Sequence, residues 1–340
     1  MAGSAYRAAR RNWGQISAMA TTLTAIVAVL LTGLSFTETR RQVSVAEQGQ
    51  ITDRYGKAVE QLAKQGPEQL QIRLGGIYAL QRLAGDSPRD LPTIVAVLSS
   101  FVRSAAPVPP AGMDACPDAA PSTDVQAAVT VLSLFEPSTE VPDLRSTCLQ
   151  RTRLYPTSTV RGLLAANFEG ADLRGSSLDL LDLSEARFEG ANLDRAAIRN
   201  STIPWFALSD VHMSGADLFG SDLSTHCPQH TFPKVPMLDL SGVQMRNTIL
   251  SNCELGSQIF RQTELSFATL RGANLQLADL SGSNLHSADF RGAKLQDADL
   301  RGAHLFEADL SGADLTGIKH DAYTQVTKVK TDSSTKGKWW

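Results

Sequence analysis

Residues 273–292 read ANLQL ADLSG SNLHS ADFRG, four blocks of five residues that share a pattern of small, Asp or Asn, and apolar residues. The central apolar residue recurs every five positions without a miss, thirteen times from Leu163 to Leu223 and sixteen times from Leu240 to Leu315. A period of five fits neither the 3.6-residue turn of an α-helix nor the two-residue alternation of a β-strand. The sequence therefore predicts a solenoid in which each unit is a short straight segment followed by a corner.

The position two residues before each central residue is small in most units, usually Ala or Ser. Asp or Asn often stands between the two, as in Asp172, Asn192 and Asn274. A central Leu or Phe that points inward beside a small side chain would fill a narrow bore without clashes. This packing explains why only 6% of the residues are aromatic although 42% are hydrophobic.

These blocks resemble the pentapeptide repeat family, whose unit is A(D/N)Lxx, and the resemblance covers residues 161–315. It implies an all-β solenoid, a right-handed quadrilateral β-helix with four pentapeptides in each coil. The twenty-nine units would then form about seven coils stacked at about 4.8 Å. Every repeated position of such a coil serves packing, so only the outward positions remain for a partner.

The two runs are out of phase, because the separation of Leu223 from Leu240 is not a multiple of five. We therefore expect an inserted loop of about 12 residues, with a distorted coil beside it. Four residues near this loop are too large for the small position, namely Phe206, Val211, Leu238 and Val243. After Leu315 the pattern ends, and the tail with Trp339 and Trp340 is expected to fold over the last coil, to fray or to touch a membrane surface.

No charged residue occurs between Arg11 and Glu38, and the most apolar part of this stretch covers residues 16–36. As a helix this part is long enough to cross the hydrocarbon core of a bilayer, with Trp13 at the interface. The alternative is a cleaved signal peptide, but the stretch exceeds a typical h-region and no A-x-A site follows it. The sequence thus predicts one uncleaved transmembrane helix.

Apolar residues at helical spacing predict a small α-helical region between this anchor and the repeat. The stripes cover residues 51–62, 70–83, 91–102 and 124–134. We expect Ser87 to cap one of these helices and Thr123 or Asp124 to cap another. Arg73 and Arg103 are interpreted as solvated charges on helix faces rather than as a clamp for a ligand.

Several stretches of this region resemble the membrane-anchored pentapeptide repeat proteins of actinobacteria. They are QGQITDRY (48–55), RLGGIYAL (73–80), DSPRD (86–90), SFVR (100–103) and DVQAA (124–128). The resemblance implies that this block lies between a transmembrane helix and the repeat, and that most of the chain is cytoplasmic. It implies no biochemical activity.

The four cysteines are widely spaced and match neither a disulfide framework nor a paired CxxC zinc pattern. Unpaired cysteines favour a reducing compartment, in agreement with a cytoplasmic solenoid. The charges that flank the anchor nearly balance, so they do not set its orientation. A zinc site on His226, Cys227, His230 and Cys253 is disfavoured, because the spacing matches no standard finger and Cys253 is explained as a packed thiol.

No catalytic or nucleotide-binding motif occurs in the chain, so we predict no enzyme and no catalytic, cofactor-binding or metal-binding residue. The net charge of −3 excludes a strongly basic nucleic-acid binder, and the apolar content argues against disorder. The sequence predicts a membrane-anchored scaffold for a protein partner, without a nucleic-acid or small-molecule partner. The alternative is an acidic DNA mimic that regulates a DNA-binding enzyme, since residues 161–320 contain 13 Lys or Arg and 20 Asp or Glu.

These interpretations divide the chain into seven parts. They are an N-terminal flank with the anchor (1–41), a helical region with a Pro- and Ala-rich loop (42–135), a linker or cap (136–160), the first part of the solenoid (161–223), an inserted loop (224–239), the second part of the solenoid (240–318) and a C-terminal tail (319–340).

Overall fold

A computed structural model describes residues 48–110, 115–135, 139–154, 163, 165–208, 211–224, 227 and 238–340. By its internal contacts the chain divides after Lys57, and the described part of the first unit is helical, over residues 48–57. The expected transmembrane segment, residues 16–36, lies outside the described residues. Among the helices of the described ranges, none combines the length and apolarity that a membrane crossing needs.

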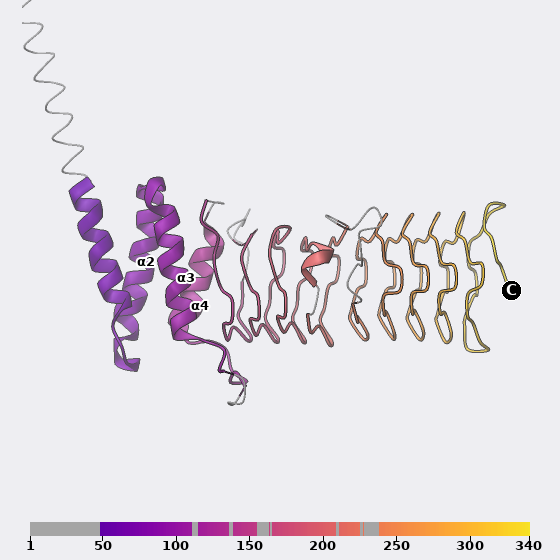
Figure 1. Cartoon of the computed structure of the whole chain (residues 1–340), viewed down its shortest axis with the longest axis horizontal. Helices are drawn as coiled ribbons and strands as arrows, with labels where there is room; N and C mark the ends of the chain where they lie inside the picture. The colour runs from indigo at the N-terminus through magenta and orange to yellow at the C-terminus, as the bar shows by residue number, and fades with distance from the viewer. Residues whose placement is uncertain are drawn as a thin grey trace, which may run out of the picture. The chain divides into compact units, whose positions relative to one another are not determined.

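Three labelled helices form a small module in the second unit, together with residues 58–62, the end of the helix that begins at residue 48 (Figure 1). The helices are α2 (Leu70–Asp86), α3 (Leu91–Ala105) and α4 (Thr123–Leu134), with the 3-10 turns η1 (Pro67–Gln69) and η2 (Pro88–Asp90) before α2 and α3. Each of α2, α3 and α4 packs against the other two. The predicted apolar stripes at 70–83, 91–102 and 124–134 are confirmed as the core of this module, whereas in the stripe Ile51, Tyr55, Val59 and Leu62 only Leu62 is buried. The buried residues of the three stripes include Ile77, Leu80, Leu83, Ile94, Leu98, Val102, Val125, Val129 and Leu132.

The predicted helix caps are wrong in detail. Ser87 precedes η2 as expected, but its hydroxyl donates to the Asp90 carboxylate (2.7 Å) and not to the backbone. Helix α4 is preceded by Ser122, so Thr123 and Asp124 both lie inside its first turn. Asp124 is buried there, because it has a partner on α2 that the sequence does not reveal.

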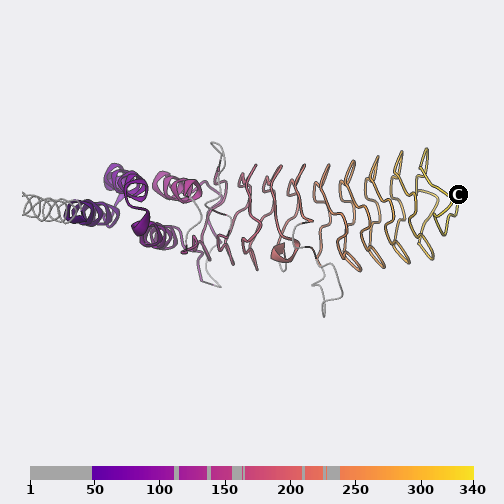
Figure 2. The same cartoon turned by 90° about the horizontal axis from the view of Figure 1, so that it is seen from above.

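The repeat folds into a four-sided β-solenoid whose coils lie side by side (Figures 1 and 2). Each face contributes one bridge residue, and successive coils pair in parallel, as in Glu254 with Asn274 and Asn274 with Lys294. The Asn274 N–H donates to the preceding coil (Cys253 O, 2.9 Å), and the Leu275 N–H donates to the following coil (Lys294 O, 2.7 Å). These bonds satisfy the backbone on both sides, which a stack of short segments requires.

The bore contains the predicted residues. The central residues and the small residues two positions before them are almost fully buried, as shown by Leu275, Phe290 and Ala278, each at 0% exposure. Phe168 and Phe188 stack on each other in neighbouring coils, with ring centroids 5.1 Å apart. Burial of each Leu or Phe contributes on the order of 1.5–3 kcal/mol, so the bore is the main source of stability of the solenoid.

Most corners adopt a turn whose third residue has a positive φ, for example Gly282 at 66°. The Ser283 N–H bonds to the Leu280 carbonyl (3.2 Å) and closes that turn. Glycine suits this position because side chains clash in the left-handed region. The same conformation is nonetheless occupied by large apolar residues at three exposed corners, Leu180, Phe267 and Leu277.

The solenoid extends beyond both expected boundaries. Bridges begin within the expected linker 136–160, where Asp143 pairs with Asn167. They continue into the expected tail, where Asp314 pairs with Lys336. Both pairs are further apart in the sequence than those of a regular coil. The expected boundaries at 161 and 318 are therefore too narrow. The first coil keeps the five-residue spacing at Asp143, Cys148 and Arg153 but is out of phase with the later units, and the last coil loses the strict spacing.

The insertion is shorter than expected. Asp217 pairs with Gln244 and Asp222 with Ile249, so this coil is seven residues longer than a regular one. A local distortion is present as predicted, since the 3-10 turn η3 (Trp205–Leu208) stands where one face would continue. Trp205 is buried there and contacts Phe260 (6.4 Å between centroids).

The helical module covers the open edge of the first coil on three faces. The Gln126 side chain bonds to both backbone groups of Arg153, accepting from its N–H (3.0 Å) and donating to its carbonyl (2.9 Å). On another face the Ser99 hydroxyl accepts from the Asp143 N–H (3.2 Å), and Arg103 donates to the Asp143 carbonyl (2.7 Å). On the third face, residues 106–108 run antiparallel to residues 146–148.

These side chains replace the coil that is missing before the first one, and such capping protects a solenoid from edge-to-edge association. The helical module is thus the cap of the first coil, whereas the described part of the expected linker or cap 136–160 supplies bridge residues of that coil. Arg103 also forms an ion pair with the Asp143 carboxylate (3.0 Å), so its interpretation as a solvated charge is wrong.

The last coil closes the other end with hydroxyl groups and lysines. Thr324 donates to the Leu300 carbonyl and Thr335 to the Leu310 carbonyl, each at 3.0 Å. The residues that follow its bridge positions no longer resemble the repeat: His320, Val326, Thr331 and Gly337. Exposed lysines along this coil disfavour pairing with another edge: Lys319, Lys328, Lys330, Lys336 and Lys338. Trp339 stacks on His320 (4.9 Å), so the C-terminal residues pack against this coil.

Candidate functional site

The acidic residues of the repeat serve the turns. The Asp or Asn before each central residue accepts a hydrogen bond from the N–H two positions later, as when the Asp289 carboxylate accepts from the Arg291 N–H (3.1 Å). Asn284 does the same for the His286 N–H (3.2 Å). The preference for Asp or Asn at this position follows from this role, because both side chains supply an oxygen at the right distance.

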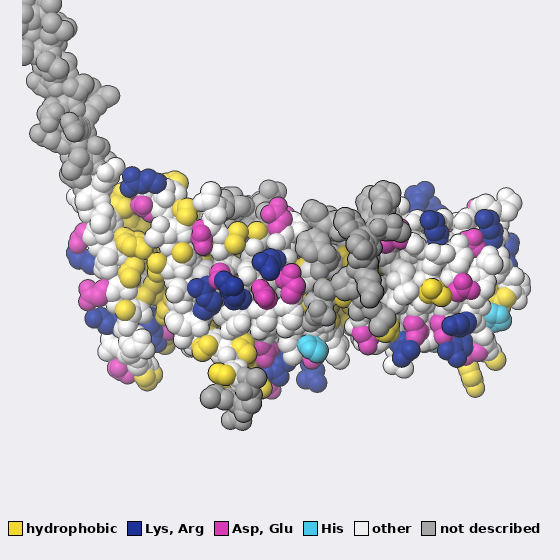
Figure 3. Space-filling view, viewed as in Figure 1, with side chains coloured by type: hydrophobic (Ala, Val, Ile, Leu, Met, Phe, Trp, Pro, Cys, Tyr) yellow, Lys and Arg dark blue, Asp and Glu magenta, His cyan; other side chains and the backbone are white. Residues whose placement is uncertain are grey.

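Arginines neutralise many of these carboxylates. Arg174, Arg291 and Arg301 each pair with the Asp two positions earlier, at N–O distances of 2.5 to 2.7 Å. Arg261 instead reaches across to Asp279 of the next coil (2.5 Å). On the side of the solenoid seen in Figure 3, positive and negative side chains are interspersed rather than separated into fields.

These contacts predict a loss of stability in acid. Hydrogen bonds from Arg291 and Arg301 lower the pKa values of Asp289 and Asp299, and the Ser334 hydroxyl with backbone N–H groups lowers the pKa of Asp332 to about 2. Because these pKa values lie below the unfolded value of about 3.9, the stabilisation is fully present above that value and is lost as the pH falls toward the folded pKa values. Thermal unfolding followed by circular dichroism across the acidic range should show the midpoint falling with pH.

A matched variant tests the cause. The variant combines Asp289→Asn with Asp299→Asn and so removes two titrating groups. Each turn keeps an acceptor oxygen, because Asn274 and Asn284 accept the same hydrogen bond in their turns. The acid-induced fall of the midpoint should be smaller in this variant than in the wild type. An unchanged pH profile would contradict the assignment of acid sensitivity to these carboxylates.

One corner of the solenoid carries an exposed apolar ridge. The ladder of bridges Ser177–Ala197–Asp217–Gln244–Glu264–Asn284–His304 runs along one face, and five large apolar or aromatic residues follow it at the next corner. We call them the ridge: Leu180, Phe219, Phe267, His286 and Phe306. Leu180 is 58% exposed, Phe267 49% and Phe219 36%. These three side chains therefore contribute little to the core, whereas His286 and Phe306 are half-buried.

Three of these rings form a continuous stack over three coils. Phe267 meets His286 edge to face (5.1 Å), and His286 stacks on Phe306 (5.2 Å). The His286 ring nitrogen Nδ1 lies 3.1 Å from the Phe306 carbonyl, which fixes the ring. Lys328 extends the column, with its ammonium 5.0 Å from the Phe306 ring centroid and 3.3 Å from Glu307. The stack is ordered because backbone bonds hold each coil in register.

Two apolar residues of the ridge have a backbone conformation that destabilises the folded chain. Leu180 and Phe267 have φ values of 61° and 59°, where a side chain costs roughly 1–2 kcal/mol relative to glycine. Burial does not offset this cost, because both side chains are about half exposed or more. Exposed apolar residues in a row are typical of interaction surfaces.

The stretches RLGGIYAL and DVQAA meet in the helical module. Arg73 Nε lies 2.5 Å from the Asp124 carboxylate, and its guanidinium also donates to the carbonyls of Lys64 (3.1 Å) and Gly66 (2.7 Å). The interpretation of Arg73 as a solvated charge is thus wrong. Gly76 allows the close approach of two helices, since a Cβ there would lie 2.7 Å from the Ala58 carbonyl oxygen. Packing explains both stretches without a ligand.

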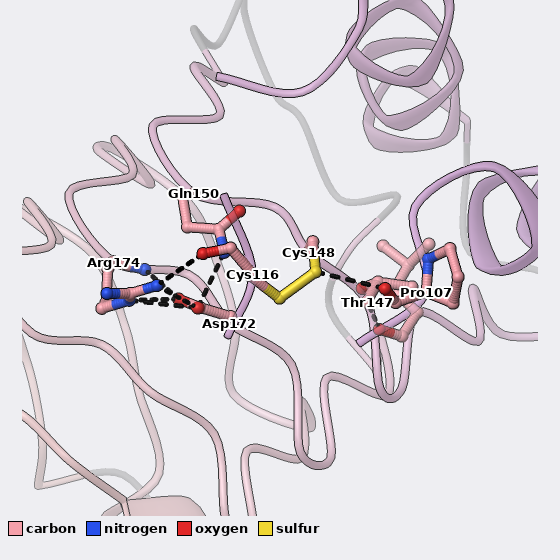
Figure 4. Close-up of a disulfide and its surroundings, with 8 residues drawn as sticks. Pro107, Cys116, Thr147, Cys148, Gln150, Asp172 and Arg174 are labelled. Atoms are coloured by element: carbon pink, nitrogen blue, oxygen red, sulfur yellow. Dashed lines mark hydrogen bonds and ion pairs between the residues drawn. A yellow bond between two sulfur atoms is a disulfide. The ribbon is translucent and has the colours of Figure 1, made fainter. Parts of the chain in front are cut away.

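All four cysteines are paired, which corrects the sequence interpretation. Cys116 bonds to Cys148, and Cys227 bonds to Cys253. Cys253 is therefore no free packed thiol. Figure 4 shows the first disulfide beside Asp172, which is held by Arg174 and by the Gln150 amide (2.7 Å).

The zinc hypothesis loses two of its four ligands to the second disulfide, since neither Cys227 nor Cys253 is a thiolate. His226 and His230 lie outside the described residues. Within the described ranges, no group of three or more His, Cys, Asp or Glu side chains has the arrangement of a metal site. The ridge remains the feature that core packing explains least.

Four faces to a coil, each with one inward Leu or Phe and one parallel bridge to the next coil, define a four-sided β-solenoid protein. The family model for pentapeptide repeats matches with eight copies, over residues 165–202, 239–276, 248–286 and 283–319. The matched residues, within 165–202 and 239–319, belong to the pentapeptide repeat family. The chain's narrower similarity to membrane-anchored actinobacterial members stays a prediction.

Solved structures similar to this chain are also pentapeptide repeat proteins. Alr5209 from Nostoc PCC 7120 is 29% identical over 28% of this chain and 86% of its own, with a TM-score of 0.25. HetL, involved in heterocyst differentiation regulation in Nostoc sp. strain PCC 7120, is 26% identical over 55% of this chain and 80% of its own, also with a TM-score of 0.25. QnrB1, a plasmid-mediated fluoroquinolone resistance protein, is 25% identical over 53% and 76%, with a TM-score of 0.23. A search of curated proteins finds no match.

Proposed function

We propose that this chain is a non-enzymatic scaffold that binds a protein partner along the ridge and is tethered to a cell membrane by residues 16–36. The observation that carries the proposal is the ridge itself, a set of apolar and aromatic side chains at one corner of a regular solenoid, three of them exposed and two half-buried, with Arg199 and Arg246 on the two coils between. Its rings are pre-ordered by stacking, so a partner would not have to order them on binding. Phe is among the residues enriched in the buried centres of protein interfaces.

The membrane tether is supported by the sequence. Residues 16–36 contain no charged side chain and have the length of a single crossing. A chain held in this way would place a rigid platform at a membrane, where a partner meets it at raised local concentration.

The DNA-mimic alternative has weaker support. A mimic of duplex DNA needs unpaired negative charge in a continuous field. Here the acids accept hydrogen bonds from their own turns and pair with arginines, for example Asp299 with Arg301 and Asp279 with Arg261. An apolar ridge is also not expected on a surface that imitates the charged phosphates of DNA.

Site-directed photocrosslinking tests the ridge as an interface. A photoreactive phenylalanine analogue at Phe267 should give one discrete crosslinked product in native membranes. The matched control is Leu277, which has the same left-handed backbone (φ 60°) and similar exposure (61%) but stands on a different corner. The analogue at Leu277 should give little or none of the product, because this corner lies away from the ridge. Equal yields at both positions, or no product at Phe267, would contradict the proposal.

A further inference from the structure

Each of the two disulfides joins a loop to a coil of the solenoid. Cys116 lies in the Pro- and Ala-rich loop and Cys227 in the inserted loop, and each bonds to a cysteine of a coil, Cys148 or Cys253. The Cα–Cα distances of 5.6 and 5.1 Å are those of ordinary disulfides. Each bridge thus fastens an irregular segment to the solenoid, and no cysteine is left over.

Both bridges are enclosed by the fold. Cys253 is fully buried at the small position where most units have Ala, and Cys227, Cys116 and Cys148 are between 5% and 8% exposed. The Cys116 carbonyl also accepts from Arg174 (3.4 Å), whose carboxylate partner Asp172 pairs with Cys148 across the ladder. Hydrogen bonds therefore hold both the loop and the coil in place beside the Cys116–Cys148 disulfide, as expected of a structural disulfide.

We infer that the helical module and the solenoid lie on the oxidising, extracytoplasmic side of the membrane. Structural disulfides persist in oxidising compartments, whereas the thiol pools of the cytosol keep cysteines reduced. The expected cytoplasmic location rested in part on unpaired cysteines, and this premise is wrong. The nearly balanced flanking charges permit either orientation, so the cysteines decide it.

The inference rests on the anchor of the proposed function for its topology, but not for the state of the cysteines. In that orientation Arg7, Arg10 and Arg11 are the cytoplasmic flank, which the nearly balanced flanking charges permit. Each bridge forms when two thiols lose two protons and two electrons to a disulfide-containing oxidoreductase, which is reduced to its dithiol. The compartment supplies this oxidant.

The first experiment counts thiols on the full chain in the cells that make it. Acid quenching, followed by denaturation and alkylation with a mass-tagged maleimide, should add no tag before reduction and four tags after it. In Cys227→Ala, one tag should appear before reduction, on Cys253, while the Cys116–Cys148 bridge stays closed. Four tags on the wild type before reduction would overturn the inference.

The second experiment reads the topology. A cysteine introduced at exposed Ser333 of the last coil should react with a membrane-impermeant maleimide in intact cells, and one introduced at Ser4 should react only after lysis. The opposite result would overturn the inference while leaving the anchor intact. Release of the chain from membranes by alkaline carbonate would instead refute the anchor, and the thiol count would then decide the compartment alone.

Discussion

Arg73→Ala is expected to lower the free energy of unfolding of the helical module by about 3–5 kcal/mol, because it leaves a buried carboxylate without its partner. The Asp124 side chain is 4% exposed and that of Arg73 14%. Burial opposes ionisation of Asp124, but hydrogen bonds from Ser122 and Arg73 outweigh it and lower the pKa of the carboxyl group. Without Arg73, the carbonyls of Lys64 and Gly66 lose a donor as well.

Denaturant unfolding followed by circular dichroism at the helical band measures this loss. The control is Arg82→Ala on the same helix, since Arg82 is exposed; we expect a change within about 0.5 kcal/mol. Arg73→Met combined with Asp124→Leu removes both charges together and should recover much of the loss. A loss below about 1 kcal/mol for Arg73→Ala would show that Asp124 finds another partner or is solvated.

The bore could be predicted from the sequence because each inward residue lies five positions from the next, so its pattern is local. The last coil could not, because its bridge positions are unevenly spaced, as Lys319, Gln325, Lys330 and Lys336 show. The first coil keeps the spacing of five residues but is out of phase with the later units. What identifies them is the pairing with the neighbouring coil. Pairing at such uneven spacings leaves no periodic signal in a single sequence.

The ridge was missed for a related reason. Phe267, His286 and Phe306 are almost equally spaced along the sequence, and a coil of four units would place them at one corner. Phe219 lies at the same corner only because the insertion lengthens its coil by seven residues. The break in the sequence pattern predicts a loop of about 12 residues instead, which would place Phe219 elsewhere. The pairing of the cysteines was hidden in the same way, since both bridges connect loops to coils 26 or 32 residues away.

Phe290→Ala should cost the solenoid about 3–5 kcal/mol, because Phe290 is fully buried and its removal leaves a cavity between coils. Leu270 and Leu310 lie above and below it on the same face, and neither can move inward while its coil is held by backbone bonds such as that from the Phe290 N–H to the Asp309 carbonyl (2.8 Å). The cavity therefore stays open and the full penalty applies.

Guanidinium unfolding followed by circular dichroism measures this loss, with Phe267→Ala as the control. Phe267 is an aromatic residue of the same solenoid but half exposed, so its removal should cost no more than about 1 kcal/mol. Because coils interact only with their neighbours, a defect at Phe290 separates the last two coils from the rest. We therefore expect protection from hydrogen exchange to fall first from residue 290 to the C-terminus, while coils before Leu270 stay protected. Equal losses for both variants would mean that the surface stack, and not the bore, holds the coils together, and the ridge would then need no partner to explain it.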